Sequence, residues 1–281
     1  MKYKLLMLDV DGTLIPYNYD ALPSDRVAAA IQKASKKVTV CLVTGRSFTF
    51  SEPVLKKVNL HTGYIVVNNG SHVYDITEKK IIYDQPLERS DALFVLKTLQ
   101  DAQISCYVKQ EFTGFSYREP FQKDEKLNKA YMLFVDEKYS QTQVEAVARK
   151  LSHLHEVTMV KSHHKHPDKF GFIISHVKAT KLHGAQIIME KLGVQKEQVI
   201  GVGDSYNDFP LLMASGLKIA MGNAVSDLKA IADFVAPAVT EDGVVTVIEK
   251  FILIFSCFWP GADNLTQDRE LADMIGIVLS H

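Results

Sequence analysis

Short apolar runs alternate with segments of helical length in the first quarter of the chain, and this alternation constrains the fold most strongly. Strands are expected at Tyr3–Asp9, Val38–Val43 and Tyr64–Val67. Ser24 has the side chain of an N-cap for a helix through Lys36, and a second helix is expected near Ser51–Lys57. Because successive strands separated by helices connect through right-handed crossovers, the pattern predicts a parallel sheet.

The middle of the chain has a different pattern, which indicates an inserted unit. From about Ile81 to Ser175 the order becomes helix, strand, strand, and then strand, helix, strand, strand. The segments are Leu87–Ala102, Ile104–Lys109, Phe112–Arg118, Tyr131–Val135, Gln141–Leu151, Val157–Lys161 and Phe170–Ile174. The parallel pattern then resumes with a helix Thr180–Leu192 stopped by Gly193, a strand Val199–Val202, a helix Tyr206–Ala214, a strand Leu217–Ala220 and a final helix Asp242–Phe255.

The expected fold is therefore α/β. A Rossmann-like parallel sheet with helices on both faces, residues 1–80 and 177–258, is interrupted by an α+β cap, residues 81–176. Residues 259–281 form a C-terminal extension to which the pattern assigns no role.

Composition excludes several classes of protein. A length of 281 residues suits one large or two modest domains, and a formal net charge of -1 gives no reason to expect nucleic acid or an anionic membrane as partner. Three scattered cysteines suggest neither a disulfide framework nor a metal cluster. The apolar run Phe251–Trp259 is far shorter than the roughly 20 residues of a membrane helix, so a docked helix or a dimer surface is expected there. No signal-peptide pattern precedes Asp9, and we expect a cytoplasmic monomer or homodimer.

The run Asp9-Val10-Asp11-Gly12-Thr13 follows the apolar stretch Leu5–Leu8. The strand period of two puts Asp9 and Asp11 on one side of an extended backbone, and Gly12 permits a sharp turn. Two such carboxylates at the carboxyl end of a strand repel each other unless a cation lies between them, and Mg²⁺ suits oxygen ligands. The alternative is an ordinary Asp-rich turn.

Other strand ends carry matching groups. Thr44 follows the second strand, Lys181 begins the segment after the insert, and Asp204, Asn207 and Asp208 follow a later strand. In a doubly wound sheet these ends lie at one edge, where acids, a hydroxyl, an amide and a lysine would make a site for a metal and a phosphoryl group. Each also has a simpler explanation. Asp204 and Asp208 could be acids favoured at the start of a helix, Thr44 a residue that ends a strand, and Lys181 a surface lysine.

Together these motifs resemble the Cof-type branch of the haloacid dehalogenase-like phosphohydrolases, whose members carry a large cap. The resemblance covers roughly residues 3 to 255. It rests on Asp9-x-Asp11-Gly-Thr, Thr44-Gly45-Arg46, Asn69-Gly70, Lys181, Gly203-Asp204-x-x-Asn207-Asp208, Met221-Gly222-Asn223-Ala224 and Glu241-Asp242-Gly243-Val244.

The resemblance implies roles for these residues. Asp9 would be the nucleophile that forms an aspartyl-phosphate, and Asp11 would protonate the leaving alcohol and then activate water. Mg²⁺ would be bound by Asp9, the carbonyl of Asp11, Asp204, and Asn207 or Asp208. Thr44 and Lys181 complete the implied catalytic set: Thr44 and the backbone near Gly12 would hold phosphate oxygens, and Lys181 would stabilise charge on the phosphoryl group and Asp9. The implied substrate-binding set is Gly12, Thr44, Gly45, Arg46, Asn69, Lys181 and Asn207, in which Arg46 either contacts substrate or seals the sheet edge.

One motif departs from the family pattern. Related chains usually have Gly-Val-Ser-Lys before the helix, whereas this chain has Lys178-Ala179-Thr180-Lys181. Lys178 therefore competes with Lys181 as the motif lysine, and the distance to the helix stop at Gly193 favours Lys181.

The cap offers weaker signals. His163, His164 and His166 would form a metal cluster or, more simply, a solvated loop, because no regular ligand spacing accompanies them. Phe112, Phe115, Tyr117 and Arg118 alternate on the expected hairpin and mostly indicate packing, although Tyr117 or Arg118 could face the site and contact substrate.

The resemblance thus implies a Mg²⁺-dependent phosphatase for a small soluble phosphomonoester, such as a sugar phosphate, with a small phosphorylated metabolite as its partner. A phosphomutase or phosphotransferase would have the same residues. A phospho-accepting signalling module is disfavoured by the length and by the position of Asp9 on the first strand, and a catalytically silent binding protein is disfavoured because every motif acid is present.

Overall fold

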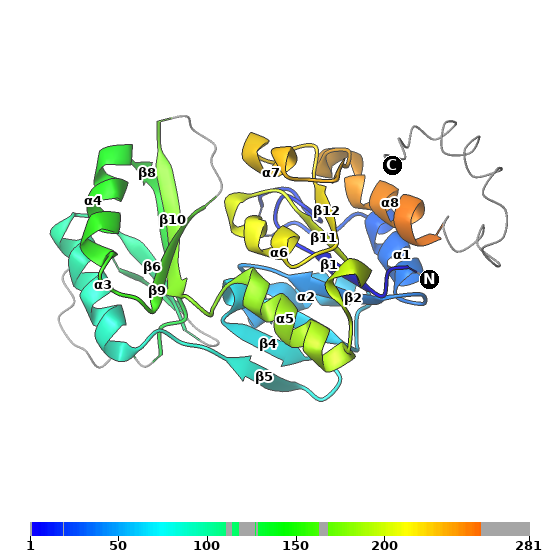
Figure 1. Cartoon of the computed structure of the whole chain (residues 1–281), viewed down its shortest axis with the longest axis horizontal. Helices are drawn as coiled ribbons and strands as arrows, with labels where there is room; N and C mark the ends of the chain where they lie inside the picture. Colours follow the sequence, from blue (N-terminus) through cyan, green and yellow to red (C-terminus); the bar gives the residue numbers. More distant parts are fainter. Residues whose placement is uncertain are drawn as a thin grey trace.

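The structure, a computed structural model, contains two β-sheets (Figure 1). It describes residues 2–18, 20–110, 127, 129–162 and 168–253, and the backbone alone of Gly114–Tyr117. The larger sheet has the strand order β13-β12-β11-β1-β2-β3-β4-β5, and the smaller has the order β7-β6-β8-β10-β9. We call the unit built on the larger sheet the core.

The centre of the core sheet is parallel and buried. β1 (Leu5–Leu8) lies between β11 (Val199–Gly203) and β2 (Thr39–Val43), with Leu5 opposite both Val199 and Thr39. β3 (Tyr64–Val67) extends the sheet on one side, and β12 (Leu217–Ala220) and β13 (Phe234–Val235) extend it on the other. This arrangement confirms the Rossmann-like parallel sheet.

Alternate residues of the buried strands pack on opposite faces, as the strand period requires. Leu6 and Leu8 belong to a cluster with α1 (Asp25–Ala34), α2 (Phe48–Lys57) and α8 (Gly243–Ile248). Leu5 and Met7 belong to a second cluster with α5 (Lys181–Leu192) and α6 (Phe209–Met213). A short helix α7 (Ser226–Ala230) packs near β12, and a π-helical turn, Glu249–Leu253, continues α8.

An antiparallel hairpin extends the core sheet at one edge. β4 (His72–Asp75) pairs with β3, and β5 (Lys80–Asp84) pairs with β4. Because β5 belongs to the core sheet, the chain leaves the core after Asp84 rather than at residue 81. The sequence pattern had not indicated these two strands.

The inserted unit, residues 85–176, is an antiparallel sheet covered on one face by two helices. Its elements are α3 (Arg89–Asp101), β6 (Cys106–Lys109), β7 (Gly114–Tyr117), β8 (Met132–Tyr139), α4 (Gln141–Leu151), β9 (Val157–Lys161) and β10 (Phe170–His176). Their order is the one expected from the sequence. The helices α3 and α4 lie on the side away from the core (Figure 1), so the other sheet face is turned toward it. We call this unit the cap.

The two connections between core and cap run close together. The hydroxyl of Ser71 donates to the carbonyl of Tyr131 at 3.0 Å, and the Gln85 N–H donates to the carbonyl of Ser71 at 2.8 Å. The hydroxyl of Tyr83 donates to the carbonyl of Lys178, on the returning connection, at 2.8 Å. The two chain connections are therefore bonded at the same edge of the core.

Some expectations fall outside the described residues. These are the tail 259–281, the apolar run beyond Leu253, Arg118 and the histidines at 163, 164 and 166. No helix in the described ranges combines the length and the apolar character that crossing a membrane requires.

Candidate active site

Three carboxylates converge at the carboxyl ends of the central strands. Asp9 follows β1, Asp204 follows β11, and Asp208 ends a 3-10 turn, Tyr206–Asp208, that precedes α6. Their oxygens lie within 4.8 Å of one another, and all three side chains are buried. We call these residues the acidic triad.

Two glycines make this close approach possible. Gly12 has φ +82°, and a Cβ there would lie 2.3 Å from Oδ2 of Asp204. A Cβ on Gly203 would lie 2.5 Å from Cβ of Asp208. The side chain of Asn223 donates to the carbonyl of Gly12 at 2.8 Å, which holds this turn from the other side.

Lys181 joins the triad from the first residue of α5. Its Nζ donates to Oδ1 of Asp9 and, at 2.6 Å, to Oδ1 of Asp208, and the side chain is fully buried. Lys178 is exposed instead, so the structure brings Lys181 and not Lys178 to the carboxylates.

The position of Lys181 depends on Gly70. This residue ends a 3-10 turn, Asn68–Gly70, with φ +111°, and a Cβ on it would lie 2.1 Å from the carbonyl oxygen of Thr180. Only glycine fits against the start of α5 without displacing it.

Burial of three acids beside one lysine leaves the site short of positive charge. Burial, together with the charge of Asp208, raises the pKa of Asp9 to about 7 against the opposing effect of Lys181. Burial and the charges of Asp208 and Asp9 likewise raise the pKa of Asp204. Burial alone would lower the pKa of Lys181, but the carboxylates of Asp208 and Asp9 raise it above its usual range. The site therefore favours a further cation.

Hydrogen bonds fix the orientation of two of the acids. Oδ2 of Asp208 accepts from the backbone N–H groups of Asp204 and Ser205, both at 2.9 Å. Asp204 accepts from the hydroxyl of Thr13 at 3.2 Å and from the hydroxyl of Tyr17. The donor set of hard carboxylate oxygens, held in fixed directions and carrying excess negative charge, fits a divalent ion such as Mg²⁺.

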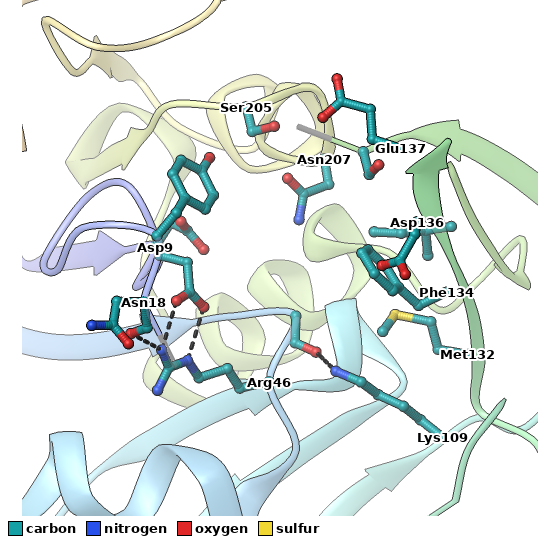
Figure 2. Close-up of a pocket in the computed structure, with 15 residues that line it drawn as sticks. Asp9, Asn18, Arg46, Lys109, Met132, Phe134, Asp136, Glu137, Ser205 and Asn207 are labelled. Atoms are coloured by element: carbon teal, nitrogen blue, oxygen red, sulfur yellow. Dashed lines mark hydrogen bonds and ion pairs between the residues drawn. The ribbon is translucent and has the colours of Figure 1, made fainter. Parts of the chain in front are cut away.

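Asp11 lies apart from the triad. Its carboxylate accepts two bonds from Arg46, 2.8 Å from Nε and 2.6 Å from Nη2 (Figure 2). Arg46 is buried and also donates to the carbonyls of Phe50 and Asn18, whereas the side chain of Asp11 is 25% exposed. Asp11 is thus held by Arg46 at the wall of a cavity.

The loops after β2, β3 and β11 are bonded to one another. The hydroxyl of Thr44, a fully buried residue, accepts from the Arg46 N–H at 3.1 Å. The Asn69 N–H donates to the carbonyl of Thr44 at 3.0 Å, and the side-chain amide of Asn207 donates to Oδ1 of Asn69 at 3.1 Å. The structure therefore gathers the core residues predicted from the sequence at one edge of the sheet.

A cavity of about 350 Å³ opens between this edge and the cap (Figure 2). Its core side is lined by Asp9, Asp11, Tyr17, Asn18, Gly45, Arg46, Ser205 and Asn207. Its cap side is lined by Lys109, Met132, Phe134, Asp136, Glu137, Ser162 and Ile173. The volume suits a small metabolite.

The sequence analysis missed the cap side of this cavity. Residues 132, 134 and 136 of β8 alternate, so a period of two was the available signal. The pairing of β8 with β10 then shifts between Phe170 and Phe172, which brings Glu137 to the cavity as well. A Cβ on Gly171 would lie 2.5 Å from Oγ of Ser162 and 2.6 Å from the carbonyl oxygen of Val135, so glycine is required opposite this bulge. Of the expected cap contacts, Arg118 and the three histidines lie outside the described residues, and only the backbone of Tyr117 is described.

Comparison with known sequences identifies relatives over most of the chain. The model of the haloacid dehalogenase-like hydrolase family matches residues 6–170 and 109–248. The chain is 26% identical over 255 residues to the 5-amino-6-(5-phospho-D-ribitylamino)uracil phosphatase YcsE of Bacillus subtilis, a match that covers 89% of this chain and 96% of the relative. It is 28% identical over 257 residues to the phosphoglycolate phosphatase of Sulfolobus acidocaldarius, with the same coverage of 89% and 96%.

Solved structures share the fold. A haloacid dehalogenase-like hydrolase from Bacillus subtilis superimposes with a TM-score of 0.76 at 21% identity, covering 89% of this chain and 100% of that one. The HAD subclass IIB sugar phosphatase BT4131 superimposes with a TM-score of 0.74 at 19% identity and the same coverage.

Proposed function

Because the chain belongs to the haloacid dehalogenase-like hydrolase family, we propose that it is a Mg²⁺-dependent phosphatase that hydrolyses a small phosphomonoester through an aspartyl-phosphate on Asp9. One observation carries the proposal: a buried acidic triad beside Lys181, of which Asp9 lines a cavity of metabolite size. The curated relatives compared above are phosphatases by name, which supports the same reaction class.

The metal would be held by Asp9, Asp204 and Asp208, with the carbonyl of Asp11 and the side chain of Asn207 as further oxygen ligands. When bound, Mg²⁺ would supply positive charge that offsets the negative charge of the transferring phosphoryl group. The triad carries three carboxylates against one lysine, and this imbalance is the reason a divalent ion fits.

The reaction needs two displacements at phosphorus. A carboxylate oxygen of Asp9 attacks the phosphorus, the bond to the ester oxygen breaks, and the leaving oxygen takes a proton from Asp11. Water then attacks the phosphorus of the aspartyl-phosphate, Asp11 takes the proton from this water, and inorganic phosphate leaves as the Asp9 carboxylate re-forms. Lys181 and Thr44, with the backbone around Gly12, would offset charge on the phosphoryl oxygens.

Arg46 would control the orientation of Asp11 in this scheme. The two bonds from Arg46 hold the Asp11 carboxylate at the cavity wall, so Asp11 has to rotate or shift to reach the ester oxygen. We assign Arg46 as a residue that positions Asp11, in addition to any contact it makes with substrate.

A phosphate-release panel tests the function. Purified protein with Mg²⁺ is assayed against sugar phosphates, phosphoglycolate and phosphorylated cofactors, and release of inorganic phosphate is measured with and without a chelator. We expect turnover that disappears in chelator and returns with Mg²⁺ or Mn²⁺, while Ca²⁺ inhibits. Full turnover in excess chelator would contradict the metal requirement.

The nucleophile is tested by trapping. With ³²P-labelled substrate and acid quenching, wild-type protein should retain label, and Asp9→Asn should retain none and lose on the order of a thousandfold or more in kcat. Asp136→Asn, which changes a cap-side acid of the same cavity, is the matched control and should keep the label. Turnover by Asp9→Asn within about tenfold of wild type would exclude Asp9 as the nucleophile.

The same panel distinguishes hydrolysis from phosphotransfer. If phosphate passes to a second alcohol, added acceptor alcohols should raise substrate consumption without raising inorganic phosphate. For a hydrolase, the two quantities should stay equal.

A further inference from the structure

Lys109 is a cap residue that lines the cavity on the side opposite Asp9. It ends β6, where it pairs with Met132 of β8, and its Nζ donates to the carbonyl of Gly45 at 2.6 Å (Figure 2). Lys109 is only 9% exposed and lines the cavity together with Gly45 and Arg46. The cap thereby places a buried ammonium group next to the Thr44-Gly45-Arg46 loop.

This ammonium group has no carboxylate partner within the part of the chain that the structure describes. Asp11 is the nearby acid, but both of its oxygens are engaged by Arg46. Burial and the charge of Arg46 lower the pKa of Lys109 to about 8, and Asp11 only partly opposes them. One carbonyl satisfies one of the three donors of an ammonium group, so two donors remain for a ligand.

The surroundings of Lys109 leave room for an anion. Met132, Phe134 and Ile173 line the neighbouring cap wall and are apolar. The cap acids of the cavity lie further along β8, because Asp136 is four residues beyond Met132, roughly 13 Å along a strand. Asp136 also pairs with Lys138 at 2.8 Å and is more than half exposed, as expected at a cavity rim. Glu137 lies beside it on the bulge.

Lys109 lies across the cavity from Asp9, the residue that would receive the phosphoryl group. Figure 2 shows Asp9 and Lys109 on opposite sides of the cavity, with Arg46, which holds Asp11, along one wall between them. A phosphoryl group at Asp9 would therefore direct its alcohol portion toward Lys109 and the apolar cap wall.

We infer that Lys109 binds a second anionic group, a carboxylate or a second phosphate, on the alcohol portion of the substrate. This inference rests on the proposed phosphatase function, because that function defines which part of the substrate faces the cap. A buried cation without a counter-ion costs free energy, and an anionic substrate would offset that cost. Lys109 is then a specificity residue that selects short anionic phosphomonoesters over neutral ones.

Three substrates on a two-carbon skeleton test the inference. They are 2-phosphoglycolate, which carries a carboxylate, ethylene glycol bisphosphate, which carries a second phosphate, and 2-hydroxyethyl phosphate, which is neutral at that end. The kcat/KM of each is measured for wild type, for Lys109→Met, and for Lys97→Met, an exposed lysine on α3 that controls for the change in net charge.

We expect Lys109→Met to lose on the order of 10- to 100-fold in kcat/KM on at least one anionic substrate, the size of a lost charge-assisted hydrogen bond, and less than about threefold on the neutral one. The anionic substrate that loses more identifies the preferred group. Lys97→Met should match wild type on all three. An equal loss of kcat/KM on all three substrates would overturn the inference, and Lys109 would then only hold the cap against the core through its bond to Gly45.

Binding separates this inference from the phosphatase proposal. Phosphonoacetate and 2-hydroxyethylphosphonate, which cannot be hydrolysed, are titrated by calorimetry into wild type and Lys109→Met. If phosphonoacetate binds more tightly than 2-hydroxyethylphosphonate and this difference depends on Lys109, the inference is supported even when no substrate turns over. The absence of turnover would then count only against the proposed phosphatase function. Equal binding of the two phosphonates by wild type would overturn the inference while leaving hydrolysis unaffected.

Discussion

Replacing Lys181 with methionine removes the cation that the acidic triad contacts. Lys181 is fully buried, and its Nζ donates to both Asp9 and Asp208, so the variant leaves three neighbouring carboxylates without a charged partner. Removing one partner of a buried ion pair costs about 3–5 kcal/mol, because the remaining charge stays out of water. We expect the free energy of unfolding of Lys181→Met to fall by this amount in the absence of metal.

Magnesium should restore part of the loss. A ligand that binds only the folded state adds about 2.7 kcal/mol when its concentration is 100 times its Kd. Since the variant triad carries one more uncompensated negative charge, Mg²⁺ should stabilise the variant more than the wild type. Phosphatase activity should nevertheless stay on the order of 100-fold or more below wild type, because in the proposed mechanism Lys181 also offsets charge on the phosphoryl group.

Urea unfolding followed by circular dichroism measures both effects. Wild type, Lys181→Met and Lys191→Met are compared in chelator and in saturating Mg²⁺ at neutral pH. Lys191 lies exposed in the last turn of the same helix, so its replacement should change stability by less than about 0.5 kcal/mol. A Lys181→Met protein within about 1 kcal/mol of wild type in chelator would refute the view that the triad depends on this lysine.

Three further changes follow from the structure. Gly70→Ala should cost at least about 2 kcal/mol more than Gly63→Ala in urea unfolding: both glycines have positive φ, but only the Cβ on Gly70 meets backbone, at 2.1 Å. Burial lowers the pKa of His72 from 6.5 to about 4, so folding is favoured most above pH 6.5, where His72 is neutral in both states. As the pH falls toward 4, the free energy of unfolding should decrease by up to about 3 kcal/mol. His72→Gln should flatten this part of the stability–pH curve. Gly171→Ala should change the ranking of substrates in kcat/KM while leaving the Mg²⁺ requirement unchanged, because it displaces the bulge that carries Glu137; an unchanged ranking would count against a role of the bulge in recognition.

The sequence predicts the central fold well because the physical signals there are local. The strands β1, β2, β3 and β11 are mostly apolar, and each is followed directly by a polar residue: Asp9, Thr44, Asn68 and Asp204. The prediction of helix Thr180–Leu192, with Gly193 after it, agrees with α5, whose C-cap glycine is left-handed with φ 61°. The same local signals indicated Asp9, Thr44 and Asp204, whereas Lys181 was chosen over Lys178 by its resemblance to the family pattern.

Tertiary pairing explains what the sequence could not supply. β4 and β5 are short and partly polar, and they form only because β3 offers an edge. The strand expected to end at Val135 continues to Tyr139, because pairing with β10 holds polar residues that have no strand signal of their own. Lys109 reaches the cavity because the strand register sets it opposite Met132. The register between strands that are distant in sequence cannot be predicted from the residues of one strand.

Asp11 shows where a local rule stops applying. The period of two predicts that Asp11 lies beside Asp9, but β1 ends at Leu8 and the chain turns immediately, with an isolated bridge from Asp11 to Ile15. Asp208, not Asp11, provides the third side chain of the triad, and Arg46 holds Asp11. The part that the carbonyl of Asp11 plays in metal binding stays a prediction.

The pairing of β1 with β11 has a consequence for how the chain is made. During synthesis the first five strands of the core and the whole cap leave the ribosome before Val199, so one side of β1 stays open until the last third of the chain arrives. Long-range pairing of this kind is slow and exposes apolar edges meanwhile. Asp204 and Asp208 follow the strand that closes the sheet, so a chain that ends before β11 carries Asp9, the proposed nucleophile, and Lys181 without the other two acids of the triad. Binding of a divalent ion to all three acids would then require that β11 has formed and has paired with β1.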